Sequence, residues 1–502
     1  MLAWTIYLSF AGALLSALVP EGRAQLARWL ALSCAVAGLA VAVVGYFSAM
    51  GQGRIVAVDA AWIPAMGIRY TLAADGISRV LVLLTGLASV SGVLFSWNIE
   101  KRTGHFFAFF LALIGGVYGV FLSYDLFLLF VFYEIAIVPK YFLIAIWGST
   151  RREYGAMKLA LYSFVGSSMV LIGMLAVYTA TGAHTMSLVD LSHANLPVGF
   201  QLAFFPLVFV GFAILAGMWP FHTWAPTGHV AAPTGASMLL AGVVMKLGAY
   251  GCLRVGLGLF PHGLDPWGIS FLGIGSWRDV FALLAVIGIL YGALVALVQS
   301  DFKFVIGYSS VSHMGFVILG LMTLNQIGLD GAVLQMFSHG IIAGLLFGIV
   351  GRIVYERTHT RQLDELETMN LSRRLPFAAG AFVVAGMASM GLPGFSGFIA
   401  ELQVIVGSWK LNPVWTIATA VGIVIGVAYT WRALQKAFFS DKQPTAEDHP
   451  KTGWHDLAAI TWPEYAGVGL LTFVSLAVGL YPRILLDSIE PAVKALLAGG
   501  IQ

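Results

Sequence analysis

The stretch LSYDLFLLFVFYEIAIVPKYFLIAIWG, residues 122–148, decides the fold of this 502-residue chain. It is apolar over the roughly 20 residues that an α-helix needs to cross a bilayer, yet it carries Glu134. An ionised carboxylate is costly in hydrocarbon, so a glutamate inside a spanning helix indicates a functional site. Lys246 and Glu401 repeat the anomaly in two other apolar segments. Acidic and basic groups inside a membrane protein favour a path for protons.

Composition extends this interpretation to the whole chain. It is 59% hydrophobic and only 10% charged, against roughly 25% charged in an ordinary soluble domain. The net charge is +3, and no basic stripe alternates with aromatic residues, so nucleic-acid binding is not expected. Cys34 and Cys252 lie far apart in apolar segments, and no nucleotide-binding motif is present. We therefore expect an all-α polytopic membrane protein without metal, iron–sulfur or nucleotide cofactor.

Apolar runs of spanning length predict about 14 transmembrane helices. Their approximate ranges are 1–19, 28–49, 77–97, 105–122, 124–147, 157–180, 201–218, 235–256, 278–299, 304–323, 331–352, 376–408, 413–436 and 463–484. The first range lacks a basic leader and a cleavage site, so it is expected to be a spanning helix and not a removable signal.

Two of these predicted helices are interrupted. MWPFHTWAPTGHVAAPT, which follows the seventh, contains three prolines, and GLPG (391–394) lies in the middle of the twelfth. Broken helices five apart favour two inverted five-helix repeats with the conducting path at the breaks; two independent proline kinks are the alternative. We expect helices 1–3 in residues 1–104, a first repeat (helices 4–8) in 105–256, a second, inverted repeat (helices 9–13) in 278–436, and a cytoplasmic loop, helix 14 and tail in 437–502.

The basic residues predict the orientation. Loops after odd-numbered helices carry more than twice as many Lys and Arg as loops after even-numbered helices. Because cytoplasmic loops are enriched in these residues, the odd loops are expected in the cytoplasm and both termini outside.

Several further groups are candidates for proton transfer. His313 and His339 lie in apolar helices, and imidazole titrates near physiological pH; helix packing is the alternative role. Lys303, near the cytoplasmic end of its helix, could reach into the bundle or mark its boundary. His222 and His229 flank the break after helix seven, where unwound backbone can line a wet cavity.

Lys140 is ambiguous. It follows Glu134 by six residues, about 9 Å along an ideal helix and about 120° around it, so the two share no face unless Pro139 redirects the chain. Lys140 either handles protons or extends to the membrane interface. Asp75 and Arg79, four residues apart at the start of helix three, are expected to form a supporting ion pair.

Six motifs resemble one known family. YEIAIVPKYFLIAIWGSTRREYGAMKLALY, PFHTWAPTGHVAAPTGASMLLAGVVMKLGAYGCLR, QSDFKFVIGYSSVSHMGF, LQMFSHGIIAGLLF, YERTHTRQLDELETM and GLPGFSGFIAE are similar to the subunit M (chain 4) family of respiratory complex I, the proton-pumping NADH:quinone oxidoreductase. The resemblance implies a 14-helix antiporter-like fold. It also implies that Glu134 governs coupling, Lys246 is the central lysine, Glu401 belongs to the outlet half-channel, and His313 and His339 lie on the axis between them.

The same resemblance implies the setting. Flavin, iron–sulfur clusters and quinone would belong to partner subunits of the translocase, which include other membrane-arm subunits and two further antiporter-like subunits. The location would be a bacterial-type inner membrane, with both termini periplasmic. One departure stands out: Leu215 occupies the position where relatives usually carry a lysine on helix seven. We hypothesise that Lys140 replaces that cation.

Two alternatives stay open. A subunit of a cation/proton antiporter or of a membrane-bound hydrogenase would share this module, and a scaffold would hold neighbouring subunits without conducting protons. The intramembrane charges argue against a scaffold, and the YERTHTR run favours complex I. The chain also lacks the long amphipathic C-terminal extension expected of the terminal antiporter-like subunit.

Overall fold

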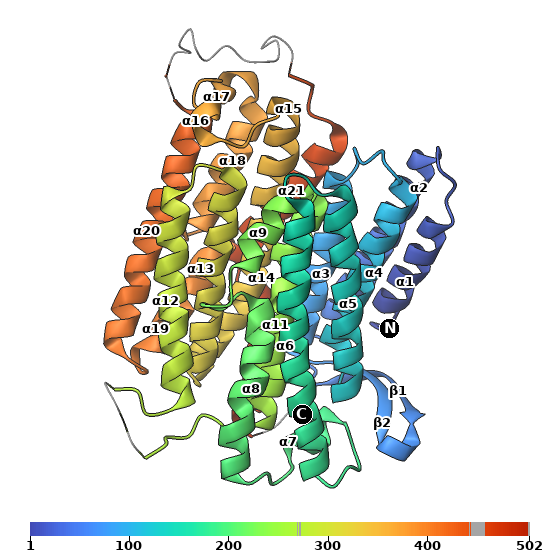
Figure 1. The fold of residues 1–502 in the computed structure, drawn as a ribbon, viewed down its shortest axis with the longest axis vertical. Coiled ribbons are helices and arrows are strands. Elements are labelled where there is room, and N and C mark those ends of the chain that lie inside the picture. Colours follow the sequence, from blue (N-terminus) through green and yellow to red (C-terminus); the bar gives the residue numbers. More distant parts are fainter. Residues whose placement is uncertain (269, 271–272, 441, 443–456, 500–502) are drawn as a thin grey trace.

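The computed structural model describes residues 1–268, 270, 273–440, 442 and 457–499. It is an elongated helical bundle (Figure 1). Among the described residues, 12 helices are long and apolar enough to cross a membrane, and two shorter apolar helices are Trp4–Ala17 and Pro376–Ser389. Each predicted transmembrane range overlaps one or more of these helices. The chain is therefore a multi-pass, mostly helical membrane protein, and the all-α expectation fails only at one β-hairpin.

The bounds of the elements, in chain order, are α1 (Trp4–Ala17), α2 (Ala24–Ser48), β1 (Ile55–Ile63), η1 (Pro64–Met66), β2 (Ile68–Ala74), α3 (Gly76–Phe95), α4 (Thr103–Leu122), α5 (Leu126–Trp147), α6 (Arg152–Ala180), α7 (Leu188–Ser192), α8 (Val198–Ala216), α9 (Trp224–Ala231), α10 (Thr234–Leu239), η2 (Leu240–Val244), α11 (Met245–Gly251), η3 (Cys252–Leu257), α12 (Trp277–Val298), α13 (Phe302–Met322), α14 (Gln326–Gly348), η4 (Ile349–Tyr355), α15 (Glu356–Thr358), α16 (Leu363–Leu366), α17 (Leu371–Arg374), α18 (Pro376–Ser389), α19 (Ser396–Trp409), α20 (Pro413–Phe438), α21 (Trp462–Leu480) and α22 (Arg483–Leu497).

The centre of the bundle is formed by two long helical runs. The most apolar windows of Thr234–Leu257 and Gln326–Thr358 are wholly buried, whereas those of α2 and α20 are only one-third buried. A helix that is hydrophobic all round belongs in the interior of a membrane protein or core. Both central runs include π-helical segments, η2, η3 and η4, a distortion that is frequent at functional sites.

The two segments predicted to interrupt helices are not continuous α-helix. Helix α8 stops at Ala216, the chain passes through Gly217 at φ +80°, and α9 begins at Trp224. The predicted range 376–408 consists of two helices, because α18 ends at Ser389 and α19 begins at Ser396. The division into two inverted repeats stays a prediction.

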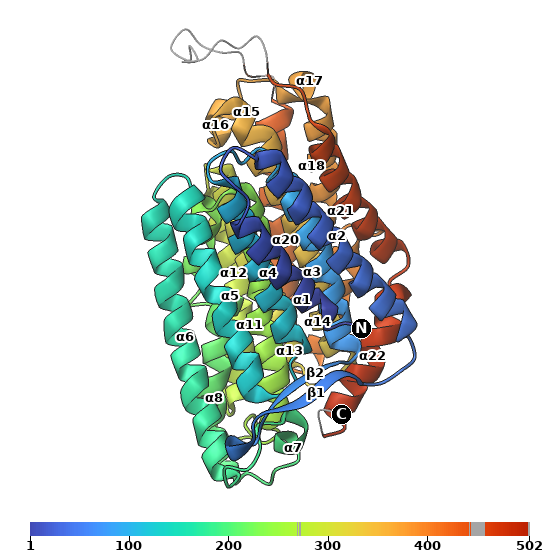
Figure 2. The ribbon, with the colours of Figure 1, turned by 90° about the vertical axis from the view of Figure 1, so that its right-hand side faces the viewer.

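One end of the bundle carries a β-hairpin that the search for apolar helices missed. Strands β1 and β2 pair antiparallel, and both chain termini lie toward this end (Figure 2). Helix α22 packs there against α3 and α14. The last predicted helix, 463–484, ends early, at Leu480, and α22 begins as a separate helix at Arg483. We call this the hairpin end, and the opposite end, which carries α15–α17, the loop end.

The predicted Asp75–Arg79 ion pair is wrong. At the hairpin end, Asp75 pairs with Arg254, and the Arg79 guanidinium donates instead to backbone carbonyls of Asp75, Ala49 and Gln52. Asp75 caps the N-terminus of α3 and therefore faces η3. The sequence feature that could have indicated this pair is Arg254, a charged residue within the same apolar segment as Lys246.

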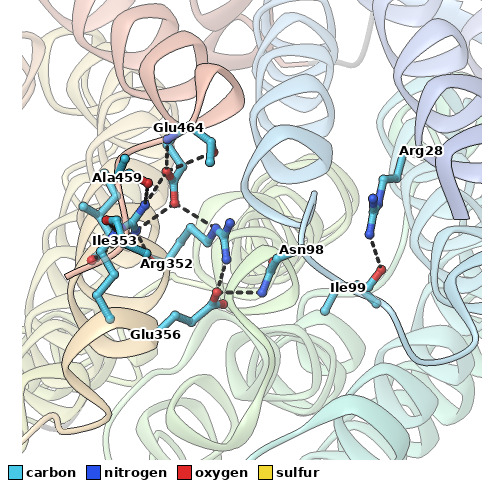
Figure 3. A network of polar contacts seen from close by, with 11 residues as sticks. Arg28, Asn98, Ile99, Arg352, Ile353, Glu356, Ala459 and Glu464 are labelled. Atoms are coloured by element: carbon cyan, nitrogen blue, oxygen red, sulfur yellow. Dashed lines mark hydrogen bonds and ion pairs between the residues drawn. The ribbon is translucent and has the colours of Figure 1, made fainter. Parts of the chain in front are cut away.

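A second buried ionic network closes the loop end (Figure 3). The Glu464 carboxylate at the start of α21 lies 2.9 Å from Arg352 Nε and 2.8 Å from Arg357 Nη2. Glu356 also pairs with Arg352 and accepts a hydrogen bond from Asn98 Nδ2 at 2.6 Å. The network ties the last transmembrane helix to η4 and to the end of α3.

Candidate functional site

Lys246 occupies the middle of the bundle. It lies on α11 directly after the π-helical η2 and is fully buried. Its Nζ donates to the carbonyl oxygen of Ala241 and lies 2.7 Å from His339 Nδ1 on α14. No carboxylate pairs with this ammonium within the described chain. A buried amine whose side-chain neighbour is an imidazole can pass a proton to it.

Two histidines and a glutamate continue from Lys246. The rings of His339 and His313 stack with centroids 5.3 Å apart and planes 18° apart. His313 Nε2 lies 3.4 Å from Glu401 Oε1, and His313 Nδ1 lies 2.7 Å from the carbonyl oxygen of Ser309. Glu401 and both histidines are buried. Lys246, His339, His313 and Glu401, from α11, α14, α13 and α19, therefore form one connected series, which we call the central axis.

The break between α18 and α19 places Glu401. Gly391 adopts φ +68°, and a Cβ added there would lie 2.6 Å from Glu401 Oε2. Glycine is the residue that adopts positive φ without steric cost. The GLPG turn therefore brings backbone against the carboxylate and fixes it beside His313.

A cavity lies at the loop end. It has a volume of about 140 Å³, and its polar lining includes Asn98, Lys303, Tyr355 and Glu356. Lys303 is buried, and its Nζ donates to the carbonyl oxygen of Ala232 at 3.3 Å. Lys303 therefore reaches into the bundle from the first turn of α13 and does not merely mark the boundary.

His229 on α9 lies near both Lys303, which lines this cavity, and Lys246 of the central axis. Its side chain is fully buried, both ring nitrogens are without a hydrogen-bond partner in the described part of the chain, and it interacts electrostatically with Lys246 and Lys303. His222 lies apart, with its ring packed on Tyr291 at 5.0 Å between centroids. Of the two histidines that flank the break, His229 is the one placed on a route inward.

Glu134 and Lys140 do not join the central axis; both turn toward α6. Lys140 is buried, and its Nζ donates to Ser163 Oγ at 3.1 Å. Glu134 is half-buried beside Ser167. Both residues therefore turn toward the same neighbouring helix, which is the case foreseen if Pro139 redirects the chain. Pro139 lies inside α5 between them, where it removes a backbone hydrogen bond and distorts the helix.

Sequence reasoning gave one buried acid, Asp75, the wrong partner and missed another, Asp330. Asp75 pairs with Arg254, whose Nε also donates to the Tyr250 hydroxyl at 3.2 Å. Asp330 on α14 is buried and accepts hydrogen bonds from Gln326 Nε2 at 2.8 and 2.9 Å. Both lie near helix starts, where an acid resembles an ordinary cap, so nothing in the linear pattern distinguished them.

Comparison with known proteins places the chain in a family. The family model described as NADH:quinone oxidoreductase/Mrp antiporter, TM, matches residues 123–426. NADH-quinone oxidoreductase subunit M of Rhodobacter capsulatus is 35% identical over 514 aligned residues, covering 99% of this chain and 96% of the relative. The subunit of the same name from Pseudomonas aeruginosa is 34% identical, covering 97% and 95%.

Solved structures agree. A chain of respiratory complex I from Thermus thermophilus with bound NADH superposes with a TM-score of 0.88 at 25% identity, covering 99% of both chains. A chain of the Mrp complex from Dietzia sp. shares the fold, with a TM-score of 0.83 at 21% identity and coverage of 98% and 99%. The chain belongs to the NADH:quinone oxidoreductase/Mrp antiporter family of membrane proteins.

Proposed function

We propose that this chain is a proton-translocating membrane-arm subunit of an NADH:quinone oxidoreductase, in which quinone reduction elsewhere in the complex drives proton movement. Full-length similarity to proteins named subunit M supports the assignment. The observation that carries it is the central axis, since a buried row of exchangeable protonic groups is costly in a membrane and is found where protons move.

The proposed path begins at the loop end. Protons enter through the cavity beside Lys303 and reach Lys246 by way of His229. Neither ring nitrogen of His229 has a hydrogen-bond partner in the described structure. The Lys246 ammonium gives its proton to His339 Nδ1 and becomes a neutral amine, while His339 becomes an imidazolium. The charge then moves to His313 and neutralises Glu401, which releases the proton toward the hairpin end.

Glu134 is proposed to link this axis to the neighbouring subunit. It lies on α5, at the edge of the bundle beside α6, whose outward face is strongly apolar at Leu161, Phe164 and Ile172. Such a face suits contact with lipid or a partner membrane subunit. Two further antiporter-like subunits and the other membrane-arm subunits are the proposed partners, and flavin, iron–sulfur clusters and quinone are proposed to lie in other subunits.

The proposed orientation follows the basic loops. The loop end would face the cytoplasm of a bacterial-type inner membrane, and the hairpin end with both termini would face the periplasm. Under this orientation the cavity at Lys303 takes protons from the cytoplasm, which is the direction that a proton-pumping complex requires.

The test is Lys246→Met in the assembled complex, reconstituted in liposomes. Proton pumping, followed with a pH-sensitive dye, is expected to fall at least about 100-fold, the usual contribution of a proton-transfer group. The matched control is Lys410→Met, which removes an exposed lysine at the end of α19. Wild-type pumping in Lys246→Met would exclude conduction through the central axis and favour a scaffold.

A cation/proton antiporter subunit is the second candidate, because the matching family model also describes Mrp antiporters. Relatives that match nearly the whole chain favour the first function, since they are named quinone oxidoreductase subunits. NADH-driven acidification that needs no sodium gradient supports the first function. Sodium-dependent proton exchange without NADH supports the second.

A further inference from the structure

Another cavity, of about 210 Å³, lies at the hairpin end and shares no lining residue with the central axis. Its floor is formed by buried residues of three separate elements, namely Asp75 and Arg79 at the start of α3, Arg254 of η3 and Ser488 of α22. Its rim is exposed and consists of the segment 51–54, directly before β1, and of the outer face of α22. A polar floor below an exposed rim is suited to binding a small charged group from outside the bundle.

The lining of this cavity carries an excess of positive charge. It contains three arginines and two aspartates. Asp75 already pairs with Arg254. Asp487 already pairs, at 3.4 Å, with Arg483, which does not belong to the lining. The two remaining arginines therefore contribute positive charge that the carboxylates of the lining do not neutralise, and the ligand that such a cavity favours is an anion.

Arg54 and Arg79 are these two arginines. Arg79 is buried, and its guanidinium donates to backbone carbonyls, which offer dipoles but no negative charge. Arg54 is exposed and makes neither a hydrogen bond nor an ion pair with any residue that the structure describes; its guanidinium lies 5.6 Å from the centre of the Tyr124 ring. Because a guanidinium has five N–H donors in a planar arrangement that matches phosphate oxygens, both arginines keep donors available for a bound anion.

The floor also holds a hydroxyl group without a partner. Ser488 is buried, and its Oγ forms no hydrogen bond within the described ranges of the chain. The hydroxyl of Tyr46, which reaches this part of α22, donates instead to the carbonyl oxygen of Ile484, one turn before Ser488. A buried hydroxyl that lacks a partner is unfavourable, so an oxygen of a bound ligand that accepts from Ser488 would remove this cost.

The side of the cavity toward the end of α22 is apolar, and it consists of Ala492, Ala495 and Leu496. The cavity also lies next to a helix that faces lipid: α2, whose most apolar window is only one-third buried, ends at Ser48, just before the rim segment 51–54. Helices α2 and α22 and the hairpin lie along the same edge of the bundle (Figure 2). A ligand that places an anion on the arginines and hydrocarbon on α22 matches a membrane lipid, whereas free phosphate has no apolar part.

We propose that this cavity binds the phosphate group of an anionic phospholipid. Arg54, Arg79 and Ser488 donate to the phosphate oxygens, and the apolar end of α22 lies against the glycerol and the first acyl carbons. Charge-assisted hydrogen bonds from arginine to phosphate are among the strong ones in proteins, and basic pockets of membrane proteins bind anionic headgroups in this way. The bound lipid joins the segment 51–54 and α3 to α22 and thereby holds α22 at the hairpin end. The site is separate from the proton path and does not depend on the proposed function.

The experiment measures binding of phosphatidylglycerol to the whole complex after lipid has been removed with detergent. Native mass spectrometry counts the lipid molecules that this subunit retains at each concentration. Arg54→Gln, which changes an exposed side chain, is expected to weaken retention about 10-fold, the effect of losing one hydrogen bond to a charged group. The matched control is Lys494→Gln, which removes an exposed cation of α22 that does not line the cavity. It is expected to retain the lipid as the wild type does.

A second variant tests the cavity without changing its charge. Ala495→Trp fills the apolar side and is expected to abolish retention, together with the rise in the thermal transition that phosphatidylglycerol gives to the wild type. Unchanged retention in both Arg54→Gln and Ala495→Trp overturns the proposal. Equal weakening by Arg54→Gln and Lys494→Gln also overturns it, because binding would then follow the general surface charge.

Two comparison ligands identify the source of the phosphate. Phosphatidylcholine has the same phosphodiester but no net charge, and inorganic phosphate has the charge but no hydrocarbon. Tighter binding of phosphatidylglycerol than of either supports the proposal. Equal retention of phosphatidylcholine would show that the arginines do not select an anion, and displacement of phosphatidylglycerol by millimolar inorganic phosphate would identify a site for free phosphate; either result overturns the assignment to an anionic lipid.

Discussion

Lys246 Nζ and His339 Nδ1 lie 2.7 Å apart inside helices that are wholly buried in the bundle. Two basic groups at hydrogen-bond distance repel if both carry a charge, so the pair favours a single shared proton. The second nitrogen of the imidazole, Nε2, has no hydrogen-bond partner in the described structure. His339 is therefore placed to receive a proton on one side and to release it on the other.

His339→Gln keeps a polar side chain of similar size but cannot become an imidazolium. Pumping is expected to fall about 100-fold, because proton transfer through a positioned group typically contributes 10²–10⁴-fold. Dye-monitored acidification of liposomes measures it. His262→Gln is the control, since His262 lies on an exposed loop and pairs with Asp265. Pumping by His339→Gln at the rate of the control would remove His339 from the path.

Gly391→Ala tests whether the turn between α18 and α19 positions Glu401. The added Cβ would lie 2.6 Å from Glu401 Oε2 and would push the carboxylate from His313. The control is Gly394→Ala, whose φ of +98° is also positive and at least as strained for alanine, while its Cβ meets open space. Pumping is expected to be about 10-fold lower in Gly391→Ala than in Gly394→Ala, since displacement by a fraction of an ångström to an ångström costs one to two orders of magnitude. Equal pumping rates in the two variants would show that backbone strain at the turn, and not displacement of Glu401, lowers pumping.

The sequence predicted the axis because its residues violate the rule that excludes charge from apolar helices. Lys246 and Glu401 were found in this way, whereas His313 and His339 were singled out because imidazole titrates near physiological pH; the structure brings the four together. What could not be predicted was the direction in which a side chain points from its helix. Whether Lys140 shares a face with Glu134 was left open because Pro139 lies between them, and linear spacing does not show how far a proline redirects a side chain.

Elements outside the apolar pattern were also missed. Strands β1 and β2 have only 9 and 7 residues, so they were passed over in a search for apolar runs of about 20 residues. Arg254 lies inside the predicted helix 235–256, but nothing in its spacing indicated a partner. Its partner, Asp75, is 179 residues away, and a contact of that separation depends on tertiary packing that no local pattern encodes.

Glu464→Gln tests the network that closes the loop end. Glu464 is buried between Arg352 and Arg357 at 2.9 and 2.8 Å. Removing one partner of a buried ionic group leaves the others uncompensated and costs about 3–5 kcal/mol. The thermal transition of the purified complex is expected to fall, as followed by light scattering and by retention of this subunit on gel filtration. Asp487→Asn, which removes an exposed partner of Arg483, is expected to change it little, since surface pairs contribute about 0–1 kcal/mol.

Lys303→Met tests the entry cavity. Lys303 lines that cavity, and its ammonium reaches the carbonyl of Ala232 directly after α9. If protons enter here, losing the amine is expected to slow pumping about 10-fold or more. Lys303→Arg is expected to pump nearly as slowly, because arginine keeps the charge but holds its proton too tightly to exchange it. Lys436→Met removes a lysine of the same end that pairs with Asp364 on the surface, and it should pump normally. Fast pumping by Lys303→Met would place the entry elsewhere, whereas rescue by Lys303→Arg would show that the charge supports the fold of α13 and does not carry protons.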